Sequence, residues 1–427
     1  MIAVATTIAA GPPSAVAIPP DRPASTPAAR PGSPLAAKAG LSRDQLAAEL
    51  NATLGAAGGS SGTWVYDTEA AKSPLLFSDE AATPRIPASN QKLFTTAAFL
   101  SELGPQARLE TRAFATGELG GPRGSTLGGD LVIVGDGDPA FGTASFARSN
   151  DQPVTRVSEL AKAVADAGVK AIAGQVLADD TIFDRERRAG PYLSPLSGLS
   201  FNNGYSGGGY ASAPELEAAK GLKQALRERG IRVQGKVSRT DLPDSRLQRK
   251  PLASVASPTV STLIEETNVP SNNFFAEMLL KRLGAAGGKR GTRHRGNQKV
   301  EAFAESVGTH VNSIDGSGLS RKNKASAEQV GRLLVAMAEP GSAARAFRGS
   351  LPLAGREGTV ADRMEGTAAE GNCATKTGTL SDVAALSGYC EAGNHTIAFS
   401  ILFNDANVDS ARAAQDRMAA AIARYQP

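Results

Sequence analysis

The spacing of apolar and polar residues changes along the chain, and the first stretch predicts two helices separated by a hairpin. Leucines four residues apart predict a helix that Ser42 caps and Gly55 ends. Two short strand-like runs, 63–66 and 75–77, predict a hairpin. Residues 89–103 are apolar almost all round, which predicts a helix buried in the centre of a domain.

The middle of the chain, residues 105–255, alternates helix-like and strand-like pieces. Two units, at 157–176 and 214–237, each run from an amphipathic helix through a glycine into a strand. The residues after the two helices echo each other, which predicts a small α/β domain with a repeated unit. The strand of the first unit covers 171–176, and the glycine-rich stretch 206–209 is expected to be a loop.

C-terminal to this region, from about residue 256, predicted helices come first and predicted strands follow. Residues 373–378 and 383–390 read as adjacent strands around a short turn. Alternating apolar residues at 397–403 predict a strand that is buried on one face only. A C-terminal helix follows, capped at Asp409 or Ser410.

Segments 41–104 and 256–427 share this mixture of helices and antiparallel strands, whereas 105–255 does not. The sequence therefore predicts an α+β fold, in which an antiparallel sheet flanked by helices is split by an inserted smaller α/β domain. Residues 1–40 have an apolar start, an A-x-A sequence at 15–17 and a stretch rich in proline and alanine, but no positively charged start. We expect a truncated export signal and a disordered linker there.

Composition narrows the class of protein and its partners. The chain has 427 residues, 41% apolar and 21% charged, with a net charge of +4. These values fit a globular protein whose basic residues are simply solvated or weakly attract an anionic surface such as a wall polymer. The densest basic cluster, within 289–295, reads as an exposed loop without interleaved aromatic residues, so nucleic acid is not expected as a partner. No apolar run approaches the ~20 residues of a membrane span.

The sequence gives no reason to expect a metal or a cofactor. Two cysteines and three histidines are scattered without the spacing of metal ligands. The stretch 135–140 mimics a G-x-G-x-x-A dinucleotide pattern. Asp136 and Asp138 would repel a pyrophosphate, however, and Pro139 removes an amide donor, so the stretch reads as a turn.

Candidate chemistry begins with Ser89 and Lys92 at the start of the apolar helix. Residues three apart in a helix share a face, so the hydroxyl and the amine would lie within reach of each other. A serine nucleophile whose base is a lysine needs this arrangement. Because an ammonium group cannot accept a proton, the pKa of Lys92 must be lowered, and burial and the nearby cation Lys376 would both lower it.

Two further motifs follow along the chain. Ser271 and Asn273 form an S-x-N motif that opens a helix at 274–283, and Lys376, Thr377 and Gly378 form a K-T-G motif in a strand. S-x-x-K, S-x-N and K-T-G in this order closely match the motif set of penicillin-binding proteins and class A β-lactamases.

Each motif residue suits a step of acyl transfer. Ser271 can relay a proton between the lysine base and the leaving amine, and Asn273 can donate to a substrate amide. Lys376 and Thr377 suit a substrate carboxylate, and Gly378 lets a substrate backbone approach the strand edge.

With these motifs the chain resembles the low-molecular-mass class C penicillin-binding proteins, which are D-alanyl-D-alanine carboxypeptidases/endopeptidases. The resemblance covers about residues 41–427, and we read the loop at 315–321 as a structural turn near the site. Stretches beyond the three motifs that carry the resemblance are 135–139, 199–203, 274–277, 315–321 and 351–355.

The resemblance implies a transpeptidase/β-lactamase-like domain, with the insert between the first and second motifs. It implies an extracytoplasmic enzyme that forms an ester on Ser89, removes the terminal D-alanine of peptidoglycan stem peptides or cuts their cross-links, and is acylated by β-lactams. Thr379 and Leu380 continue the strand motif at the substrate, and Asp138 would bind the amino group of a diamino acid. Backbone N–H groups of Ser89 and Thr379 are expected to form the oxyanion hole.

The chain departs from the family pattern in the middle region, and two alternative functions are weighed against the peptidase. Between Asn203 and Pro214 only a glycine-rich loop stands where more strand-rich sequence is expected, so the insert is expected to be shortened.

A β-lactamase or esterase on the same fold is one alternative function, although no E-x-x-x-N motif follows S-x-N. A wall-binding scaffold is another, although it has no chemical need for the motif residues.

The two cysteines form a further candidate pair. Cys373 and Cys390 lie symmetrically about residues 381 and 382, so in a hairpin centred there they face each other across neighbouring strands. They form a disulfide if the protein is exported, or stay a reduced, packed pair. A disulfide would lock the strand that carries Lys376.

Overall fold

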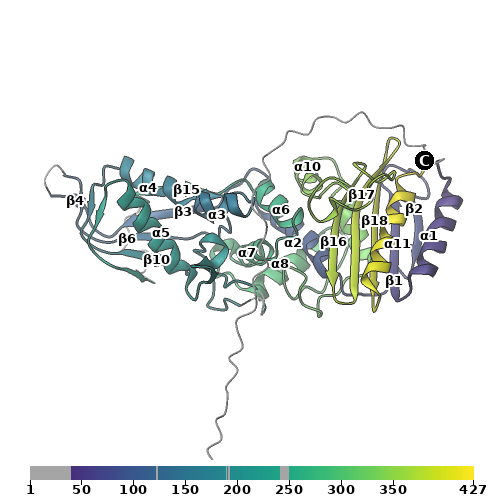
Figure 1. The fold of residues 1–427 in the computed structure, drawn as a ribbon, viewed down its shortest axis with the longest axis horizontal. Helices are drawn as coiled ribbons and strands as arrows, with labels where there is room; N and C mark the ends of the chain where they lie inside the picture. The colour runs from purple at the N-terminus through teal and green to yellow at the C-terminus, as the bar shows by residue number, and fades with distance from the viewer. Residues whose placement is uncertain (1–39, 122–123, 189, 191–192, 241–249) are drawn as a thin grey trace, which may run out of the picture. The chain divides into compact units, whose positions relative to one another are not determined.

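Strands from the two ends of the chain pair into one antiparallel sheet, at the right of Figure 1. The computed structural model describes residues 40–121, 124–188, 190, 193–240 and 250–427. A strand from the front of the chain pairs with one from the back, from Ser60 opposite Asn404 to Asp67 opposite Ile397. Both predicted hairpins are confirmed. The sheet order is β16 (Cys373–Leu380), β17 (Val383–Ala392), β18 (His395–Asn404), β1 (Ser60–Asp67) and β2 (Leu75–Asp79).

Helices cover both faces of this sheet. Phe399 of β18 belongs to the core beneath α1 and α11, whereas its neighbour Ala398 faces the core of the other helices. The sequence predicts burial of 397–403 on one face only, and this is wrong because α9 packs on the second face. The helices are α1 (Arg43–Ala57) and α11 (Val408–Ile422) on one side, and α2 (Gln91–Leu103), α6 (Val260–Asn268), α7 (Asn273–Gly284), α8 (Arg293–Ser306), α9 (Ala327–Ala336) and α10 (Ser342–Gly349) in the other core.

Two helix ends differ from the predicted ones. The side chain of Ser42 caps α1 as predicted, but the helix runs through Gly55 and ends before Gly58, whose φ is 68°. A glycine inside a helix costs about 1 kcal/mol, which burial of the leucine face offsets. α11 begins after Asn407, because the side chain of Asn407 accepts a hydrogen bond from the N–H of Ser410 at 2.9 Å.

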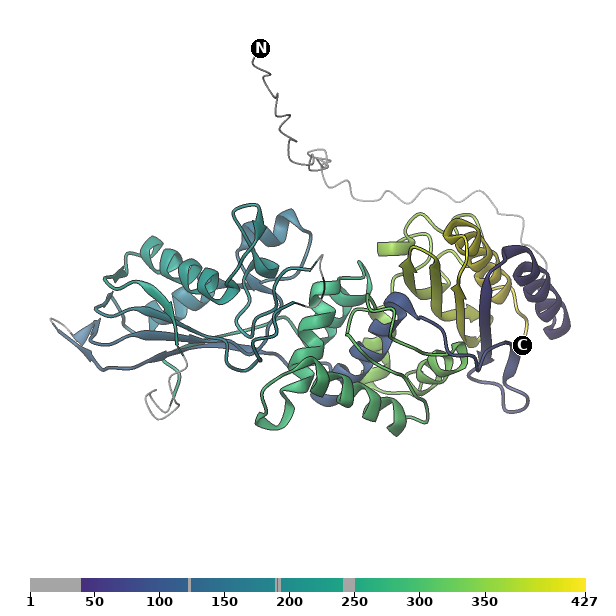
Figure 2. The ribbon, with the colours of Figure 1, turned by 90° about the horizontal axis from the view of Figure 1, so that it is seen from below.

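A second five-stranded sheet is formed by strands from the middle of the chain, the last of which ends at Ala256, at the left of Figure 1 (see also Figure 2). The helices α4 (Val157–Asp166) and α5 (Pro214–Glu228) pack against each other, and α5 packs on β10 of the sheet. This mixture of parallel strands and helices is the α/β character that the sequence predicts. The strand order is β14 (Val237–Arg239), β10 (Val176–Asp179), β6 (Leu131–Val134), β3 (Glu110–Ala115) and β15 (Ala253–Ala256).

The two echoing units of the middle region pair with each other in parallel. β9 (Ala171–Ile172) lies beside β13 (Arg232–Val233), and β10 lies beside β14. The prediction of one strand over 171–176 is wrong, because the residues divide between β9 and β10 in different sheets. The break falls at Gly174, where a Cβ atom would lie 2.5 Å from the carbonyl oxygen of Gly129.

Two segments predicted as loops contain regular structure. Residues 206–209 form the tip of a small hairpin. Arg293 and Arg295, from the basic cluster, lie in the first turn of α8, whereas Lys289 before them is exposed. The remaining elements are α3 (Ala144–Ser149), β4 (Leu119–Gly120), β5 (Thr126–Leu127), β7 (Phe141–Gly142), β8 (Thr155–Arg156), β11 (Tyr205–Ser206), β12 (Gly209–Tyr210) and the 3₁₀ turns Ala88–Asn90, Asn202–Gly204, Ala286–Gly288 and Gly358–Val360.

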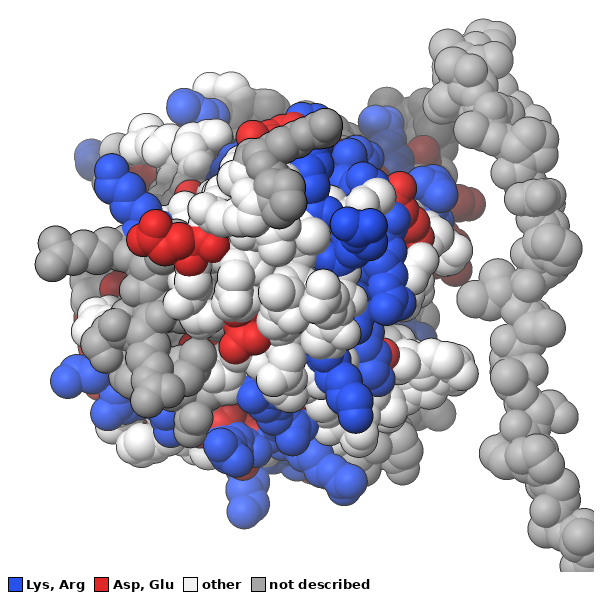
Figure 3. Space-filling model, turned by 90° about the vertical axis from the view of Figure 1, so that its left-hand side faces the viewer, with Lys and Arg blue, Asp and Glu red and all other residues white. Residues whose placement is uncertain are grey.

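Basic side chains are unevenly distributed over the surface. Figure 3 shows a face on which Lys and Arg form a continuous band. At the end of α5 and along β9 and β13, five exposed cations have no carboxylate of another described residue within 4.0 Å. They are Lys170, Arg227, Arg229, Arg232 and Lys236. The modest net charge of +4 therefore conceals a locally cationic surface.

The division of the chain into domains stays a prediction. Residues 38–427 form one compact unit, so no boundary at 105 or 255 is established. The predicted export signal and linker lie, up to residue 39, outside the described residues. Among the described helices, none combines the length and the apolar character needed to span a bilayer.

Candidate active site

Ser89 lies in a tight 3₁₀ turn, Ala88–Asn90, directly before α2. Two glycines from distant segments pack against this turn. A Cβ atom on Gly318 would lie 1.9 Å from the carbonyl oxygen of Ala88, and one on Gly378 would lie 2.9 Å from the nitrogen of Ser89. Only glycine permits such close approach, so these two residues help to fix where the serine stands.

Lys92 stands one helical turn from Ser89, as the S-x-x-K spacing predicts. Its Nζ is 3.0 Å from the Oγ of Ser89, 2.6 Å from the Oδ1 of Asn273 and 2.6 Å from the carbonyl oxygen of Ser317. The side chain is fully buried, and this burial lowers the pKa of Lys92 to about 7. A substantial fraction of the amine is therefore neutral near pH 7 and able to accept a proton.

Two buried carboxyl groups act against this effect of burial. The charges of Asp315 and Glu277 raise the pKa of Lys92, so its value is set by burial against two acids. Burial, followed by the charge of Asp315, in turn raises the pKa of Glu277 to about 7. The site thus holds two groups, Lys92 and Glu277, with pKa values near neutrality, which is typical of catalytic centres.

The loop at 315–321 is held in place by the same two acids. Oδ1 of Asp315 accepts from the N–H of Gly318 at 2.8 Å. Oε1 of Glu277 accepts from the N–H of Ser317 at 2.8 Å and from that of Gly316 at 3.0 Å. These bonds direct the carbonyl of Ser317 at Lys92, so the loop is part of the site.

Glu277 and Asp315 lie in stretches 274–277 and 315–321, which the sequence marks as family-like but without a role. Glu277 is four residues after Asn273, on the same helix face, and this spacing is the signal that could have found it. For Asp315 the sequence signal is only its place in a glycine-rich loop, which does not reveal the groups that its carboxylate binds.

Lys376 is a residue of the edge strand β16, and its side chain points into the protein interior. Its side chain is fully buried, and Nζ donates to the carbonyl oxygen of Thr377 at 3.0 Å. Burial and then the charge of Lys92 lower the pKa of Lys376 well below its usual range. The carbonyl oxygen of Lys376 also accepts from the Nδ2 of Asn90 at 2.9 Å, which ties the strand to the serine turn.

An open cavity of about 500 Å³ lies over Ser89. Ser271 lines it with its backbone in the left-handed region, at a φ of 61°, a strained conformation often found at functional sites. Ser271 makes no hydrogen bond with Lys92 in the described structure, which leaves its hydroxyl free for a substrate. The lining residues are Ser89, Ser271, Thr359, Asp362, Arg363, Thr377, Gly378, Thr379, Asp409, Arg412, Ala413 and Asp416.

Two candidate substrate residues do not line this cavity. Asp138 is buried, and its carboxylate accepts from the N–H of Ala140 at 2.8 Å and from Oγ1 of Thr155 at 2.5 Å. Burial raises the pKa of Asp138 to about 6. Leu380 ends β16 outside the lining. Substrate contacts for Asp138 and Leu380 therefore stay predictions.

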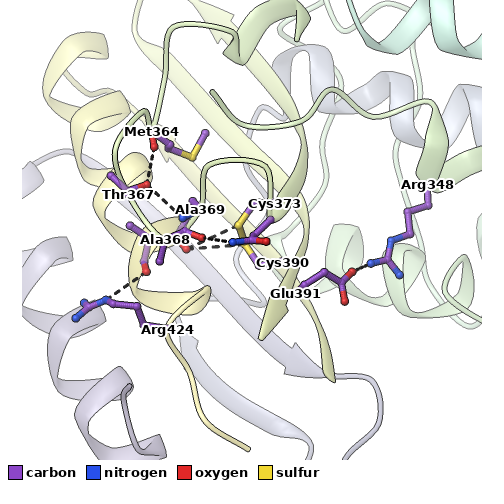
Figure 4. The surroundings of a disulfide bond; sticks show 12 residues. Arg348, Met364, Thr367, Ala368, Ala369, Cys373, Cys390, Glu391 and Arg424 are labelled. Atoms are coloured by element: carbon purple, nitrogen blue, oxygen red, sulfur yellow. Dashed lines mark hydrogen bonds and ion pairs between the residues drawn. A yellow bond between two sulfur atoms is a disulfide. The ribbon is translucent and has the colours of Figure 1, made fainter. Parts of the chain in front are cut away.

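Cys373 and Cys390 form a disulfide, which resolves the two alternatives for this pair (Figure 4). They stand opposite each other in β16 and β17, and Cys373 lies three residues before Lys376. The N–H of Cys373 also donates to the carbonyl oxygen of Ala369 at 3.0 Å. The start of the strand that carries K-T-G is therefore fixed on both sides.

Replacing both cysteines by alanine is expected to lower the free energy of unfolding by about 3 kcal/mol, the value for a closed loop of this size. The two residues are 17 positions apart, so the disulfide mainly restricts the unfolded chain. Denaturant unfolding of both proteins measures the difference. Two free thiols in the denatured wild-type protein, or an unchanged unfolding free energy, would contradict the expectation.

The fold and the three motifs define the class of protein. A serine beside a buried lysine, an adjoining S-x-N helix and a K-T-G edge strand on an antiparallel sheet are the parts of a serine-type peptidase of the penicillin-binding kind. More particularly, the chain belongs to the D-Ala-D-Ala carboxypeptidase 3 (S13) family, whose sequence pattern matches residues 44–195 and 209–425. The resemblance stated from the sequence is confirmed. The unmatched residues, 196–208, contain most of the glycine-rich hairpin.

Sequence relatives agree with this assignment, and solved structures share the fold. The chain is 30% identical to the D-alanyl-D-alanine carboxypeptidase of Actinomadura sp. (strain R39), with 86% of this chain and 82% of the relative covered. It is 27% identical to carboxypeptidase DacB of Mycolicibacterium smegmatis, with 83% and 79% covered. Its fold is similar to that of penicillin-binding protein 4 from Haemophilus influenzae, with a TM-score of 0.72, 20% identity, and 86% and 97% of the two chains covered. A predatory peptidoglycan endopeptidase from Bdellovibrio bacteriovorus gives a TM-score of 0.51 at 17% identity, with 80% and 85% covered.

Proposed function

We propose that the chain is an exported serine DD-peptidase that cleaves the D-Ala-D-Ala end of peptidoglycan stem peptides, or their cross-links, through an ester on Ser89. The observation that carries the proposal is the buried Nζ of Lys92, 3.0 Å from the Oγ of Ser89, with a pKa lowered to about 7. Membership of the family supports the substrate class. The disulfide supports export, because disulfides persist in oxidising compartments.

Acylation begins when Oγ of Ser89 attacks the carbonyl carbon of the penultimate D-alanine and its proton passes to the neutral amine of Lys92. Collapse of the tetrahedral oxyanion breaks the C–N bond. The leaving amine takes its proton from the ammonium of Lys92 through the hydroxyl of Ser271, which leaves an ester and free D-alanine. Water then attacks the ester with Lys92 as base, which releases the shortened peptide and restores the serine. A β-lactam follows the same first step and stays attached.

The backbone geometry of β16 supports an oxyanion hole and a substrate edge. The N–H of Thr375 donates to the carbonyl of Pro352 at 2.9 Å, away from β17. Alternate residues of an antiparallel strand point the same way, so the N–H groups of Thr377 and Thr379 also face the open edge. The N–H of Thr379, with that of Ser89 beside Gly378, can therefore receive the oxyanion, while the free edge pairs with an extended peptide.

Asn273 and Lys376 support the serine from two sides. Because Oδ1 of Asn273 accepts from Lys92, its Nδ2 is left to donate to a substrate carbonyl. Burial, followed by the charge of Lys92, lowers the pKa of Lys376 well below its usual range.

Incubation with a fluorescent penicillin and with a peptide ending in D-Ala-D-Ala tests the proposal. We expect a lasting fluorescent adduct and released D-alanine, both absent in Ser89→Ala. Ser381→Ala, which removes an exposed serine at the β16–β17 turn, should behave as the wild type. Rapid turnover of the drug without an adduct would indicate a β-lactamase, and neither reaction would indicate a scaffold. Either result would refute the proposed peptidase.

A further inference from the structure

The exposed cations at the end of α5 and beside the strands β9 and β13 form a surface that the chemistry at Ser89 does not use. We call this surface the cationic band, and its members are Lys170, Arg227, Arg229, Arg232 and Lys236. Among the described residues, no carboxylate lies within 4.0 Å of any of them. Other lysines of the same region are paired: Lys162 lies 2.6 Å from Asp166, and Lys220 lies 2.7 Å from Glu217. The band is therefore positive because it lacks the acids that neutralise neighbouring cations.

Backbone contacts hold the members of the band on one surface. The N–H of Arg232 in β13 donates to the carbonyl oxygen of Lys170, which precedes β9, at 3.3 Å. The helix α5 packs against β13. Nζ of Lys223 in α5 donates to the carbonyl oxygen of Gly235, which ties the helix to the segment that carries Lys236. Cations from three separate segments of the chain are thus brought side by side.

The stability of the fold explains only part of this arrangement. Arg227 lies in the last turn of α5 and Arg229 ends the helix, so both interact favourably with the negative end of the helix dipole. The three cations beside the strands have no such partner. Glu228 is exposed between the two arginines, but it accepts a hydrogen bond from Gln224 at 3.0 Å and pairs with neither of them. Uncompensated like charges repel one another, so the band favours an anionic partner.

The shape and composition of the band favour a flexible chain of anions over a membrane surface. A single small anion cannot meet cations on three segments, whereas a polymer with a charge on each repeat can contact them in turn. Residues 167–174 and 227–236 contain no aromatic residue to anchor in a bilayer interface. Leu119, an exposed leucine of the same small sheet, lies on β4, which β5 separates from β9. The large apolar side chains of these segments are all buried, namely Val169, Ile172, Ile231 and Val233.

We propose that the cationic band binds a linear wall polymer whose repeats are joined by phosphodiester groups. Three of its five members are arginines, and the planar fork of N–H groups of an arginine matches the oxygens of a phosphate. None of the five lines the cavity over Ser89, so the bound polymer leaves the cavity open. The choice of a wall polymer as partner rests on the proposed export and wall substrate, whereas the band itself is independent of them.

Binding of fluorescently labelled poly(glycerol phosphate) to the whole protein, at about 0.15 M salt, tests the proposal. The triple variant Lys170→Gln, Arg232→Gln, Lys236→Gln is expected to raise Kd by about 100-fold, the effect of losing three cations at an anionic surface. It should also reduce the slope of log Kd against log salt concentration by about 2 to 3, because fewer counterions are released.

A second triple variant removes the same net charge from exposed positions outside the band. Lys72→Gln, Lys289→Gln, Arg417→Gln should change Kd by less than about threefold, because charges farther apart than a Debye length are screened. Equal weakening in the two variants, or no binding of the polymer by the wild type, would show that the band is not its site. Tighter binding to polyglutamate, or to vesicles of roughly 3:1 phosphatidylcholine and phosphatidylglycerol, would overturn the choice of partner.

Labelling of the same preparations with fluorescent penicillin separates this inference from the proposed peptidase. Both triple variants should be acylated at the wild-type rate, because the substituted residues lie outside the cavity over Ser89. A wild-type protein that binds the polymer as expected but is never acylated would refute the peptidase and leave the band as the binding site. Normal acylation without binding of the polymer would have the opposite meaning.

Discussion

Lys92→Met is expected to fold and yet to be acylated by penicillin about 10²- to 10⁴-fold more slowly than the wild type, the usual contribution of a general base. Methionine fills a similar volume without an amine, so Ser89 loses the group that lies 3.0 Å from its hydroxyl. The substitution also leaves the carbonyl oxygen of Ser317 without its donor, so a modest loss of stability is expected. Stopped-flow acylation rates measure the effect.

The pH profile should identify the group responsible. Acylation needs the neutral amine, and burial lowers the pKa of Lys92 to about 7. The wild-type rate is therefore expected to rise with pH through about 7 and to level off above it, because the ammonium form that dominates at lower pH cannot accept a proton. The residual rate of Lys92→Met should lack this rise.

Lys281→Met supplies a matched control on α7. Lys281 is also fully buried, but its Nζ pairs with Asp184 at 2.6 Å, outside the Ser89 cavity. Losing this buried pair should lower the melting temperature without slowing acylation of the folded protein. A rate in Lys92→Met within tenfold of the wild type, or an equal loss in Lys281→Met, would show that Lys92 is not the base.

The sequence predicts well which candidate side chains lie close together where their spacing along the chain is local. Ser89 and Lys92 lie one helical turn apart, and a helical period alone brings their side chains together. The cysteine pair follows from a hairpin symmetry in the same local way. Whether the sulfurs are bonded depends on geometry and compartment, which the spacing does not supply.

Groups that position these side chains are harder to predict from the sequence, because they act through distant contacts. Glu277 holds the loop at Ser317, 40 residues away, through a carboxylate that accepts from backbone N–H groups. Because almost every residue has a backbone N–H group, nothing in the sequence of the loop reveals that it donates to Glu277. A single glycine can also mislead. Gly55 predicts the end of a helix but lies inside α1, because tertiary packing outweighs the helix-propensity cost of glycine, about 1 kcal/mol.

Gly318→Ala is expected to slow acylation by about 10²-fold or more, although residue 318 carries no reactive group. Its φ is 86°, and a Cβ atom there would lie 1.9 Å from the carbonyl oxygen of Ala88 and 2.9 Å from the nitrogen of Ser89. The serine turn or the 315–321 loop must move, and the carbonyl of Ser317 that binds Lys92 moves with the loop. A displacement near 1 Å at a reacting centre is enough for a loss of this size.

Gly308→Ala separates the effect of close approach from that of backbone strain. Gly308 also has a positive φ, 73°, but a Cβ atom there would have no neighbour within 4 Å. Alanine at either position pays the same conformational cost of about 1 kcal/mol, whereas only alanine at 318 collides with the serine turn. Both variants should therefore lose a similar increment of stability from strain, and Gly308→Ala should keep the wild-type acylation rate. Equal rates in the two variants would mean that the contact between Gly318 and Ala88 does not position Ser89.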